Sequence, residues 1–198
     1  MFFDLIVVGA SWGGLDALTV LMRGLPDDFA VPIVVVQHRS QDAESLLAEL
    51  LQQWTGRTVV ETEDKQPIEQ GHIYIAPANY HLLIEDDYFS LTTEAPVRYS
   101  RPSIDVMFGS AAHAFGERLI GVVLTGANED GSRGLQCVYE DGGYCLVQDP
   151  ATAEVATMPA AALTRVPHAT KRALPEIAGH LVDVARNGPP ATYVRATA

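Results

Sequence analysis

A serine, a histidine and an aspartate each follow a strongly apolar run of this sequence: Ser11, His38 and Asp130. Together these residue types can transfer an acyl group, because the serine hydroxyl attacks, the imidazole takes and returns its proton, and the carboxylate orients the imidazole. They occur in the order Ser, His, Asp, whereas α/β-hydrolases have the order Ser, Asp, His. Chain order places no limit on geometry, so the fold decides whether the three meet.

Ser11 lies in the glycine-rich turn Gly9-Ala10-Ser11-Trp12-Gly13-Gly14. Small neighbours allow a serine to project its hydroxyl from a tight strand-to-helix turn, and the N–H groups of the following helix could bind an oxyanion. A dinucleotide-binding turn is a second interpretation, but the middle glycine of that fingerprint and its acidic residue about 20 positions on are both missing. A plain turn in which Ser11 caps the helix is a third.

His38 and Asp130 also have purely structural interpretations. His38 could end a strand with its ring bonded to a loop, and Asp130 could cap a helix that begins near Gly131. Cys137 and Cys145 form no metal-type pair and are expected to be reduced thiols. The other histidines show no metal-ligand spacing and are expected to be surface or packing residues: His72, His81, His113, His168 and His180.

The elements that would position the three residues alternate between apolar strands and amphipathic helices. This pattern predicts an α/β fold: a doubly wound, mostly parallel sheet with helices on both faces. Because the carboxyl ends of parallel strands share one edge, Ser11, His38 and Asp130 can converge there. Short runs within residues 63–97 predict a hairpin or small antiparallel extension instead of another βαβ unit. The expected strands are 5–8, 33–37, 58–62, 119–124 and 144–147, and the expected helices are 12–23, 46–54 (capped by Asp42), 104–115 (capped by Ser103), 131–140 and 175–186.

Composition indicates one globular domain over residues 1–187 with a loose tail at 188–198. The chain has 198 residues, of which 47% are hydrophobic and 19% charged. A formal net charge of -12 argues against a nucleic-acid partner and against anionic membrane surfaces. With no secretory leader and no membrane-length apolar run, a cytoplasmic location is expected.

Several runs of the sequence together form a specific pattern: Gly9-Ala10-Ser11-Trp12-Gly13-Gly14, Val35-Val36-Gln37-His38, Gly71-His72-Ile73-Tyr74-Ile75-Ala76-Pro77, Arg101-Pro102-Ser103-Ile104-Asp105, Leu124-Thr125-Gly126 with Asp130-Gly131, and Gln148-Asp149 with Met158-Pro159. These runs resemble the catalytic domain of the bacterial chemotaxis receptor methylesterase (CheB-type) family. They cover roughly residues 4–165 in the family's order.

The resemblance implies a protein-glutamate methylesterase that hydrolyses glutamate γ-methyl esters on chemotaxis receptors and, in some members, deamidates receptor glutamines. By motif, the nucleophile falls on Ser11, the base on His38 and the orienting carboxylate on Asp130. Trp12 and Ala127 flank the pocket and oxyanion region. No metal or organic cofactor is implied. The implied partner is a methyl-accepting chemotaxis receptor or a similar methylated protein, with no nucleic acid and no insertion into a membrane.

The sequence departs from the family at two places beside the pocket. Trp12 stands where a small residue or threonine is common, and Ala127-Asn128 stands where Met-Gly is common. The family usually carries an N-terminal receiver domain, whereas the motif here begins within the first ten residues. A stand-alone catalytic domain is therefore expected, with phosphorylation supplied by a separate response regulator or absent; an excised domain is the other interpretation.

Acidic receptor bundles fit poorly with the negative net charge, so a local basic rim is the expected docking element. Arg39, Arg101 and Arg133 are the candidates for it. Two other functions stay open at this point: a serine hydrolase of the same fold with another ester or amide substrate, and a non-catalytic signalling module.

Overall fold

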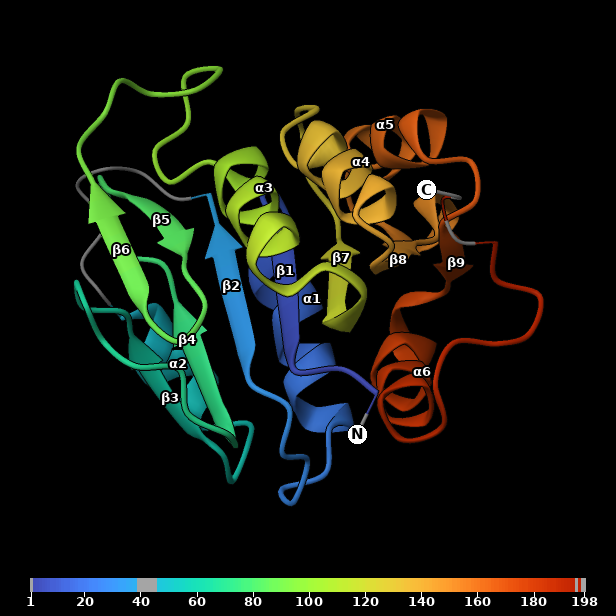
Figure 1. Cartoon of the computed structure of the whole chain (residues 1–198), viewed down its shortest axis with the longest axis horizontal. Coiled ribbons are helices and arrows are strands. Elements are labelled where there is room, and N and C mark those ends of the chain that lie inside the picture. Colours follow the sequence, from blue (N-terminus) through green and yellow to red (C-terminus); the bar gives the residue numbers. More distant parts are fainter. Residues whose placement is uncertain (1, 39–45, 195, 197–198) are drawn as a thin grey trace.

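Parallel strands built from the apolar runs form the centre of the molecule (Figure 1). The computed structural model describes residues 2–38, 46–194 and 196, and within these ranges seven strands share one sheet. The strands are β1 (Leu5–Ala10), β2 (Ile33–Gln37), β3 (Thr58–Glu61), β4 (His72–Ile75), β7 (Leu119–Val123), β8 (Tyr144–Gln148) and β9 (Thr170–Arg172). Their order across the sheet is β3-β4-β2-β1-β7-β8-β9, with every neighbouring pair parallel.

Helices cover both faces of this sheet, which confirms the expected doubly wound fold. One face carries α1 (Gly14–Gly24), α2 (Leu47–Gln52) and α6 (Leu174–Asn187), and the other carries α3 (Ile104–Phe115), α4 (Ser132–Glu140) and α5 (Thr157–Arg165). In β1, Ile6 and Val8 pack into the hydrophobic core under α1, α2 and α6, while Leu5 and Val7 pack into the core under α3, α4 and α5. A strand covered on both sides needs apolar residues at every position, which is why no polar alternation is visible in its sequence.

The chain changes direction between β1 and β7. From β1 it proceeds to one side through β2, β3 at the sheet edge and then β4 between them, and it returns to β7 on the other side of β1. In open α/β sheets, ligands bind at such a switch point, beside the carboxyl ends of the strands. The turns after β1 and β7 contain Ser11 and Asp130, so both candidate residues lie at this point.

The predicted antiparallel extension is correct in part. β5 (His81–Ile84) and β6 (Phe89–Thr92) form a separate two-stranded antiparallel sheet, as the hairpin prediction requires. The prediction was wrong for residues 73–75, which belong to β4 and lie in the main sheet between β3 and β2. Ile73, Tyr74 and Ile75 are all buried, which is the pattern of a central parallel strand. The connection from β3 to β4 contains no helix, so the usual sequence pattern of a βαβ unit is missing.

Other elements differ from expectation at their ends or were not predicted. Gly13 adopts a left-handed φ of 75° and caps α1, so the helix begins at Gly14 instead of Trp12. α5 was missed because its alanine- and threonine-rich sequence has weak apolar periodicity, and the three-residue β9 was missed because its residues are polar. Ser103 caps α3 as predicted, accepting a hydrogen bond from the Val106 N–H. The predicted cap Asp42 lies outside the described residues.

The tail after α6 makes specific contacts. The Tyr193 hydroxyl donates to the Gly143 carbonyl oxygen and accepts from the Cys145 N–H, both at 3.0 Å. Its ring packs against Tyr144 with 4.5 Å between ring centroids. Over the described ranges, none of the helices has the length and apolar character that crossing a membrane requires.

Candidate active site

Ser11 is held where β1 ends, between the ends of its two neighbouring strands. Its N–H donates to the Thr125 carbonyl oxygen at 2.9 Å, just beyond β7. Its own carbonyl oxygen accepts from the Gln37 side-chain amide at 2.7 Å, at the end of β2. A Cβ placed on Gly126 would lie 2.9 Å from the Ser11 Cβ, so the loop after β7 passes directly beside the serine.

His38 follows β2 at the level of Ser11. β1 and β2 pair with Ala10 opposite Gln37, and the His38 N–H extends the ladder by donating to the Ala10 carbonyl oxygen at 3.0 Å. The Gln37 amide nitrogen also donates to the His38 carbonyl oxygen at 2.9 Å. One partly buried amide group therefore joins the serine turn to the histidine, and it fixes the two backbones relative to each other.

Asp130 is completely buried and accepts several hydrogen bonds. His38 Nε2 lies 2.8 Å from Asp130 Oδ2, which also accepts from the Ile104 N–H at 2.7 Å. Asp130 Oδ1 accepts from the Ser103 hydroxyl at 2.9 Å and from the Asp105 N–H at 3.0 Å. Burial alone would raise the pKa of Asp130, but the hydrogen bonds from His38, Asp105 and Ile104 outweigh it and hold the pKa below its ordinary value.

The Asp130 carboxylate is held in place because α3 and α4 cap each other's first turns. Asp130, just before α4, accepts from N–H groups at the start of α3, and Asp105 in α3 accepts from the Gly131 and Gly134 N–H groups at the start of α4, each at 2.8 Å. Helix N-termini present unpaired N–H groups and favour negative charge, so each aspartate stabilises the other's helix. Burial raises the pKa of Asp105, an effect that the Gly134 N–H opposes.

The hydrogen bonds around His38 define the roles of its two ring nitrogens. Because the Asp130 carboxylate accepts a hydrogen bond, Nε2 carries the proton and Nδ1 has the lone pair. The Asn128 side chain is oriented by the Asp130 N–H, which donates to Asn128 Oδ1 at 3.1 Å. The Asn128 amide nitrogen consequently faces His38 Nδ1, at 3.5 Å. The basic nitrogen thus points away from Asp130, as proton transfer from a substrate or nucleophile requires.

Two unpaired backbone donors lie close to Ser11. The N–H groups of Trp12 and Ala127 have no hydrogen-bond acceptor within the described part of the chain. Trp12 directly follows Ser11. Ala127 directly follows Gly126, which lies against the Ser11 side chain. Such donors are suited to stabilising negative charge on a carbonyl oxygen attacked by the serine.

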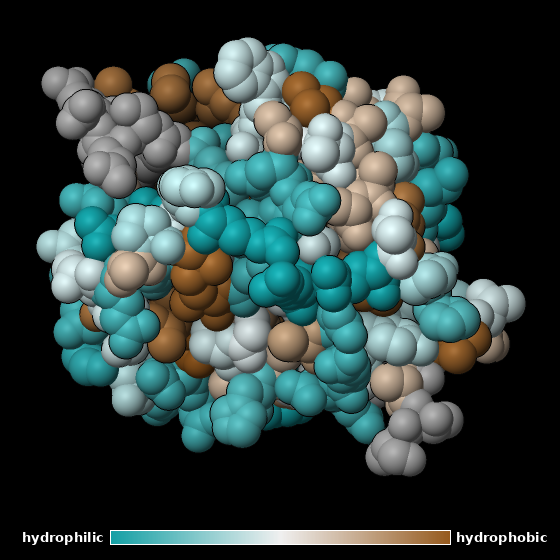
Figure 2. Space-filling view, turned by 90° about the horizontal axis from the view of Figure 1, so that it is seen from above, coloured by the Kyte–Doolittle hydropathy of each residue, from teal (hydrophilic) through white to brown (hydrophobic). Residues whose placement is uncertain are grey.

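The structure thus brings Ser11, His38 and Asp130 to one edge of the sheet, with Trp12 and Ala127 beside them. His38 and Asp130 are hydrogen-bonded, whereas the Ser11 hydroxyl makes no hydrogen bond within the described residues. Figure 2 looks down on this edge, the side to which the β2 arrow points in Figure 1, and its visible surface is mostly hydrophilic with separate apolar patches. Among the described residues, no group of three or more His, Cys, Asp or Glu side chains could hold a metal ion.

Sequence reasoning missed the roles of two residues at this edge. Asp105 was quoted only as part of the run Arg101-Pro102-Ser103-Ile104-Asp105, although it caps the neighbouring helix. Gln37 was quoted only as part of the run Val35-Val36-Gln37-His38. An amide at the end of an apolar strand, directly before a candidate base, is the pattern that could have identified Gln37 as a bridge.

The other candidates have structural partners. The Arg101 guanidinium donates to the Asn79 side chain and to the carbonyl oxygens of Thr93 and Glu94, so it supports a loop. Arg133 is exposed, and Arg39 lies outside the described residues. His81 is buried between Ser103 and Ala95, which confirms a packing role. Cys137 and Cys145 are free thiols, and burial raises the pKa of Cys145 to about 12.

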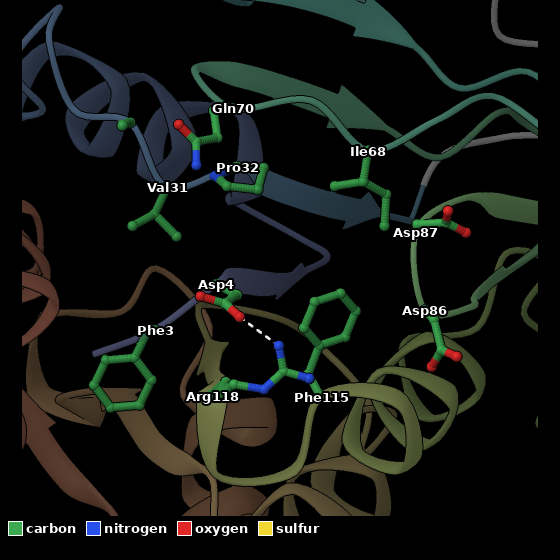
Figure 3. A pocket seen from close by; sticks show the side chains of 11 residues that line it. Phe3, Asp4, Val31, Pro32, Ile68, Gln70, Asp86, Asp87, Phe115 and Arg118 are labelled. Atoms are coloured by element: carbon green, nitrogen blue, oxygen red, sulfur yellow. Dashed lines mark hydrogen bonds and ion pairs between the residues drawn. The ribbon is translucent and has the colours of Figure 1, made fainter. Parts of the chain in front are cut away.

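A cavity of about 340 Å³ lies at the opposite edge, where the strands begin (Figure 3). Its apolar wall includes Phe3, Ile68 and Phe115, and Asp4 pairs there with Arg118. Serine, cysteine and histidine are absent from the residues that line it. The cavity therefore lacks a hydroxyl or thiol nucleophile and an imidazole base, whereas Ser11, His38 and Asp130 lie at the carboxyl edge.

Comparisons with known proteins identify a family that matches most of the chain. A model of a family described as CheB methylesterase matches residues 6–181. A relative from Anaeromyxobacter dehalogenans, named protein-glutamate methylesterase/protein-glutamine glutaminase 2, is 41% identical over 160 residues, which are 81% of this chain and 47% of that protein. A Leptospira interrogans relative, to which the same two activities are provisionally assigned, is 44% identical over 164 residues, which are 82% of this chain and 85% of that protein.

A solved structure has the same fold. The crystal structure of the Thermotoga maritima CheB methylesterase catalytic domain superposes with a TM-score of 0.89 and 30% sequence identity. The match covers 93% of this chain and 100% of that domain. The chain therefore corresponds to a complete catalytic domain of that structure, and to about half the length of the Anaeromyxobacter relative.

Proposed function

Because the chain belongs to the CheB methylesterase family, we propose that it hydrolyses glutamate γ-methyl esters on a methylated chemotaxis receptor through Ser11, His38 and Asp130. The observation that carries this proposal is the His38–Asp130 hydrogen bond at the sheet edge where Ser11 follows β1. Acyl transfer from a carboxyl ester needs no cofactor when a nucleophile, a base and an oxyanion site are present.

In the proposed mechanism, His38 Nδ1 removes the Ser11 proton as the hydroxyl attacks the ester carbonyl carbon. The tetrahedral intermediate collapses when Nδ1 returns that proton to the methoxy oxygen, so methanol leaves and a glutamyl-Ser11 ester remains. Water, deprotonated by Nδ1, then attacks this ester and regenerates the serine and a glutamate. Asp130 keeps the proton on Nε2 and stabilises the imidazolium in both steps.

The unpaired N–H groups of Trp12 and Ala127 are the proposed oxyanion donors. A single donor of this kind typically contributes about 10²–10³ in kcat. The departures from the family at both positions change side chains and leave the backbone N–H groups in place. They therefore alter what the site accepts more than the reaction that it performs.

The same acyl-enzyme supports glutamine deamidation. Attack on a glutamine side-chain amide would release ammonia in place of methanol, with the proton delivered to the leaving nitrogen by His38. The curated relative from Anaeromyxobacter dehalogenans carries both activities in its name. We propose that the chain acts as a catalytic domain over residues 1–187 in the cytoplasm, on a membrane-anchored receptor, with a response regulator as its controlling partner.

The test is methanol release from a methylated receptor fragment, with Ser11→Ala as the matched variant. We expect loss of at least about 10³ in kcat for Ser11→Ala, because the nucleophile is removed. A fluorophosphonate probe should label the wild type and leave Ser11→Ala unlabelled. Methanol release that survives Ser11→Ala would contradict the mechanism.

A hydrolase of the same fold with another substrate is the second candidate, favoured by the exposed indole of Trp12. A panel of small esters and amides beside the methylated receptor distinguishes the two functions. If fluorophosphonate labels Ser11 while the receptor releases no methanol, the second candidate is correct. A lack of labelling would instead indicate a non-catalytic module.

A further inference from the structure

Trp12 is held in one orientation although it is mostly exposed. Its side chain is 66% exposed, and its indole Nε1 donates to Glu154 Oε1 at 3.0 Å. These two residues are 142 positions apart in the sequence, so the bond depends on the fold. A fixed, exposed aromatic ring offers a flat apolar face next to the proposed nucleophile. Because the ring is already ordered, a ligand that binds to it loses less free energy to side-chain ordering.

The segment that carries Glu154 is tied to the serine turn. The Thr125 hydroxyl donates to the Trp12 carbonyl oxygen and accepts from the Val155 N–H, each at 2.9 Å. The Gly126 N–H donates to the Val155 carbonyl oxygen at 3.1 Å. Glu154 is therefore positioned relative to Ser11 by the same loop that passes beside the serine.

Glu154 also packs across the start of α1. A Cβ placed on Gly13 would lie 2.6 Å from Glu154 Oε2 and 2.7 Å from the Glu154 Cβ, so only glycine leaves room for this side chain. The carboxylate and the indole consequently form one wall beside the Ser11 turn. We call this pair, Trp12 and Glu154, the indole–carboxylate wall.

The hydrogen-bond partner of the Glu154 carboxylate is the neutral indole N–H of Trp12, so no cation neutralises it within the described residues. Within the described ranges, Glu154 forms no ion pair, whereas Glu129, also at the carboxyl edge, pairs with Arg98 at 3.4 Å. An indole face next to a carboxylate is a combination that binds cations, through the aromatic quadrupole and through charge-assisted hydrogen bonds. The formal net charge of -12 adds a field that opposes acidic groups.

Resting on the proposed function, we infer that the indole–carboxylate wall selects substrates that carry a lysine or arginine beside the methylated glutamate. The cationic side chain would lie over the Trp12 ring with its charged group against Glu154. Trp12 and Glu154 are then specificity-determining residues, and they act on binding of the flanking residue while Ser11, His38 and Asp130 act on the ester.

The test uses three peptides that contain a glutamate γ-methyl ester. The two residues that flank the ester are both lysine in the first peptide, both glutamine in the second and both glutamate in the third. For the wild type we expect kcat/KM to be about tenfold higher with lysine than with glutamate. Glu154→Gln should lower this ratio to about threefold or less. Glu49→Gln removes the same charge from the exposed surface of α2 and should leave the ratio unchanged.

A binding measurement separates failure of this inference from failure of the proposed function. In Ser11→Ala/Trp54→Phe, Trp12 is the only tryptophan, so its fluorescence reports on the wall without turnover. The lysine peptide should change the emission at lower concentrations than the glutamate peptide. Equal kcat/KM for the lysine and glutamate peptides, or an unchanged ratio in Glu154→Gln, would overturn the inference and leave the proposed function intact. If the wild type hydrolyses none of the peptides, the proposed function fails, and the fluorescence titration alone decides the inference: no preference for lysine overturns it.

Discussion

The two edges of the sheet both place an aspartate next to a strand, but in opposite surroundings. At the carboxyl edge, Asp130 is fully buried and accepts hydrogen bonds from a histidine, a serine and backbone N–H groups. At the amino edge, Asp4 is half exposed and its side chain pairs with the exposed guanidinium of Arg118 (Figure 3). A cavity of about 340 Å³ lies beside Asp4, whereas the serine and histidine lie on the same side of the sheet as Asp130.

The direction of the helices explains the difference. Helices that follow parallel strands begin at the carboxyl edge, so their unpaired N–H groups and positive dipole ends gather there. A buried carboxylate can be fully satisfied at that edge, whereas at the other edge a carboxylate depends on solvent or on a flexible cation.

The largest expected effect comes from comparing Asp130→Asn with Asp4→Asn. The Asp130 amide would turn its NH₂ toward groups that are themselves donors, and it could no longer stabilise the imidazolium. We expect kcat to fall by about 10³–10⁴ and the free energy of unfolding to fall by about 3–5 kcal/mol. Asp4→Asn should cost less than about 1 kcal/mol. Methanol release and denaturant unfolding measure both, and similar losses in the two variants would contradict the contrast between the edges.

Gln37→Ala and Gln70→Ala form a second pair, with one amide at each edge. Loss of the Gln37 bridge should shift Ser11 relative to His38 and lower kcat by about 10–100-fold with little change in KM. Gln70 lines the cavity at the amino edge, and its replacement should leave both parameters unchanged. A large rise in KM without a fall in kcat for Gln37→Ala would indicate that Gln37 binds substrate instead of positioning Ser11.

The contribution of Asp130 to the free energy of unfolding should depend on pH. The pKa of Asp130 is lowered in the folded protein, so its ionised form stabilises the fold above the unfolded-state pKa of about 3.9, and this stability is lost as the pH falls through the lower, folded-state value. The difference in free energy of unfolding between wild type and Asp130→Asn should therefore narrow below about pH 4. Urea unfolding at a series of pH values measures it. A difference that stays constant down to pH 2 would mean that the carboxylate charge does not contribute.

The smallest effect is expected for Arg118→Ala, which removes the ion pair at the amino edge. Both partners are about half exposed, with side-chain exposures of 56% for Arg118 and 47% for Asp4. Exposed pairs of this kind contribute at most about 1 kcal/mol and are screened by salt. Thermal unfolding should change little, and kcat should be unchanged. A marked loss of activity would show that the two edges are coupled.

The sequence predicted the convergence of Ser11, His38 and Asp130 because each follows an apolar strand, and the ends of parallel strands share an edge. The structure confirms that placement, while the proposed roles await the experiments above. The exchange between Asp105 and Asp130 could not be predicted, since it depends on how α3 and α4 pack against each other. β4 was assigned to the wrong sheet because a short buried strand without a preceding helix resembles half of a hairpin.

The exchange of caps between α3 and α4 has a consequence for how the active centre is assembled. Each helix leaves N–H groups of its first turn without their carboxylate acceptor until the other has docked, because that acceptor belongs to its neighbour. The side chain that orients His38 is therefore delivered in the same cooperative step that closes this layer of the molecule. A chain that is misfolded or still folding in this layer would have no properly oriented imidazole, so it would be inert toward bystander esters.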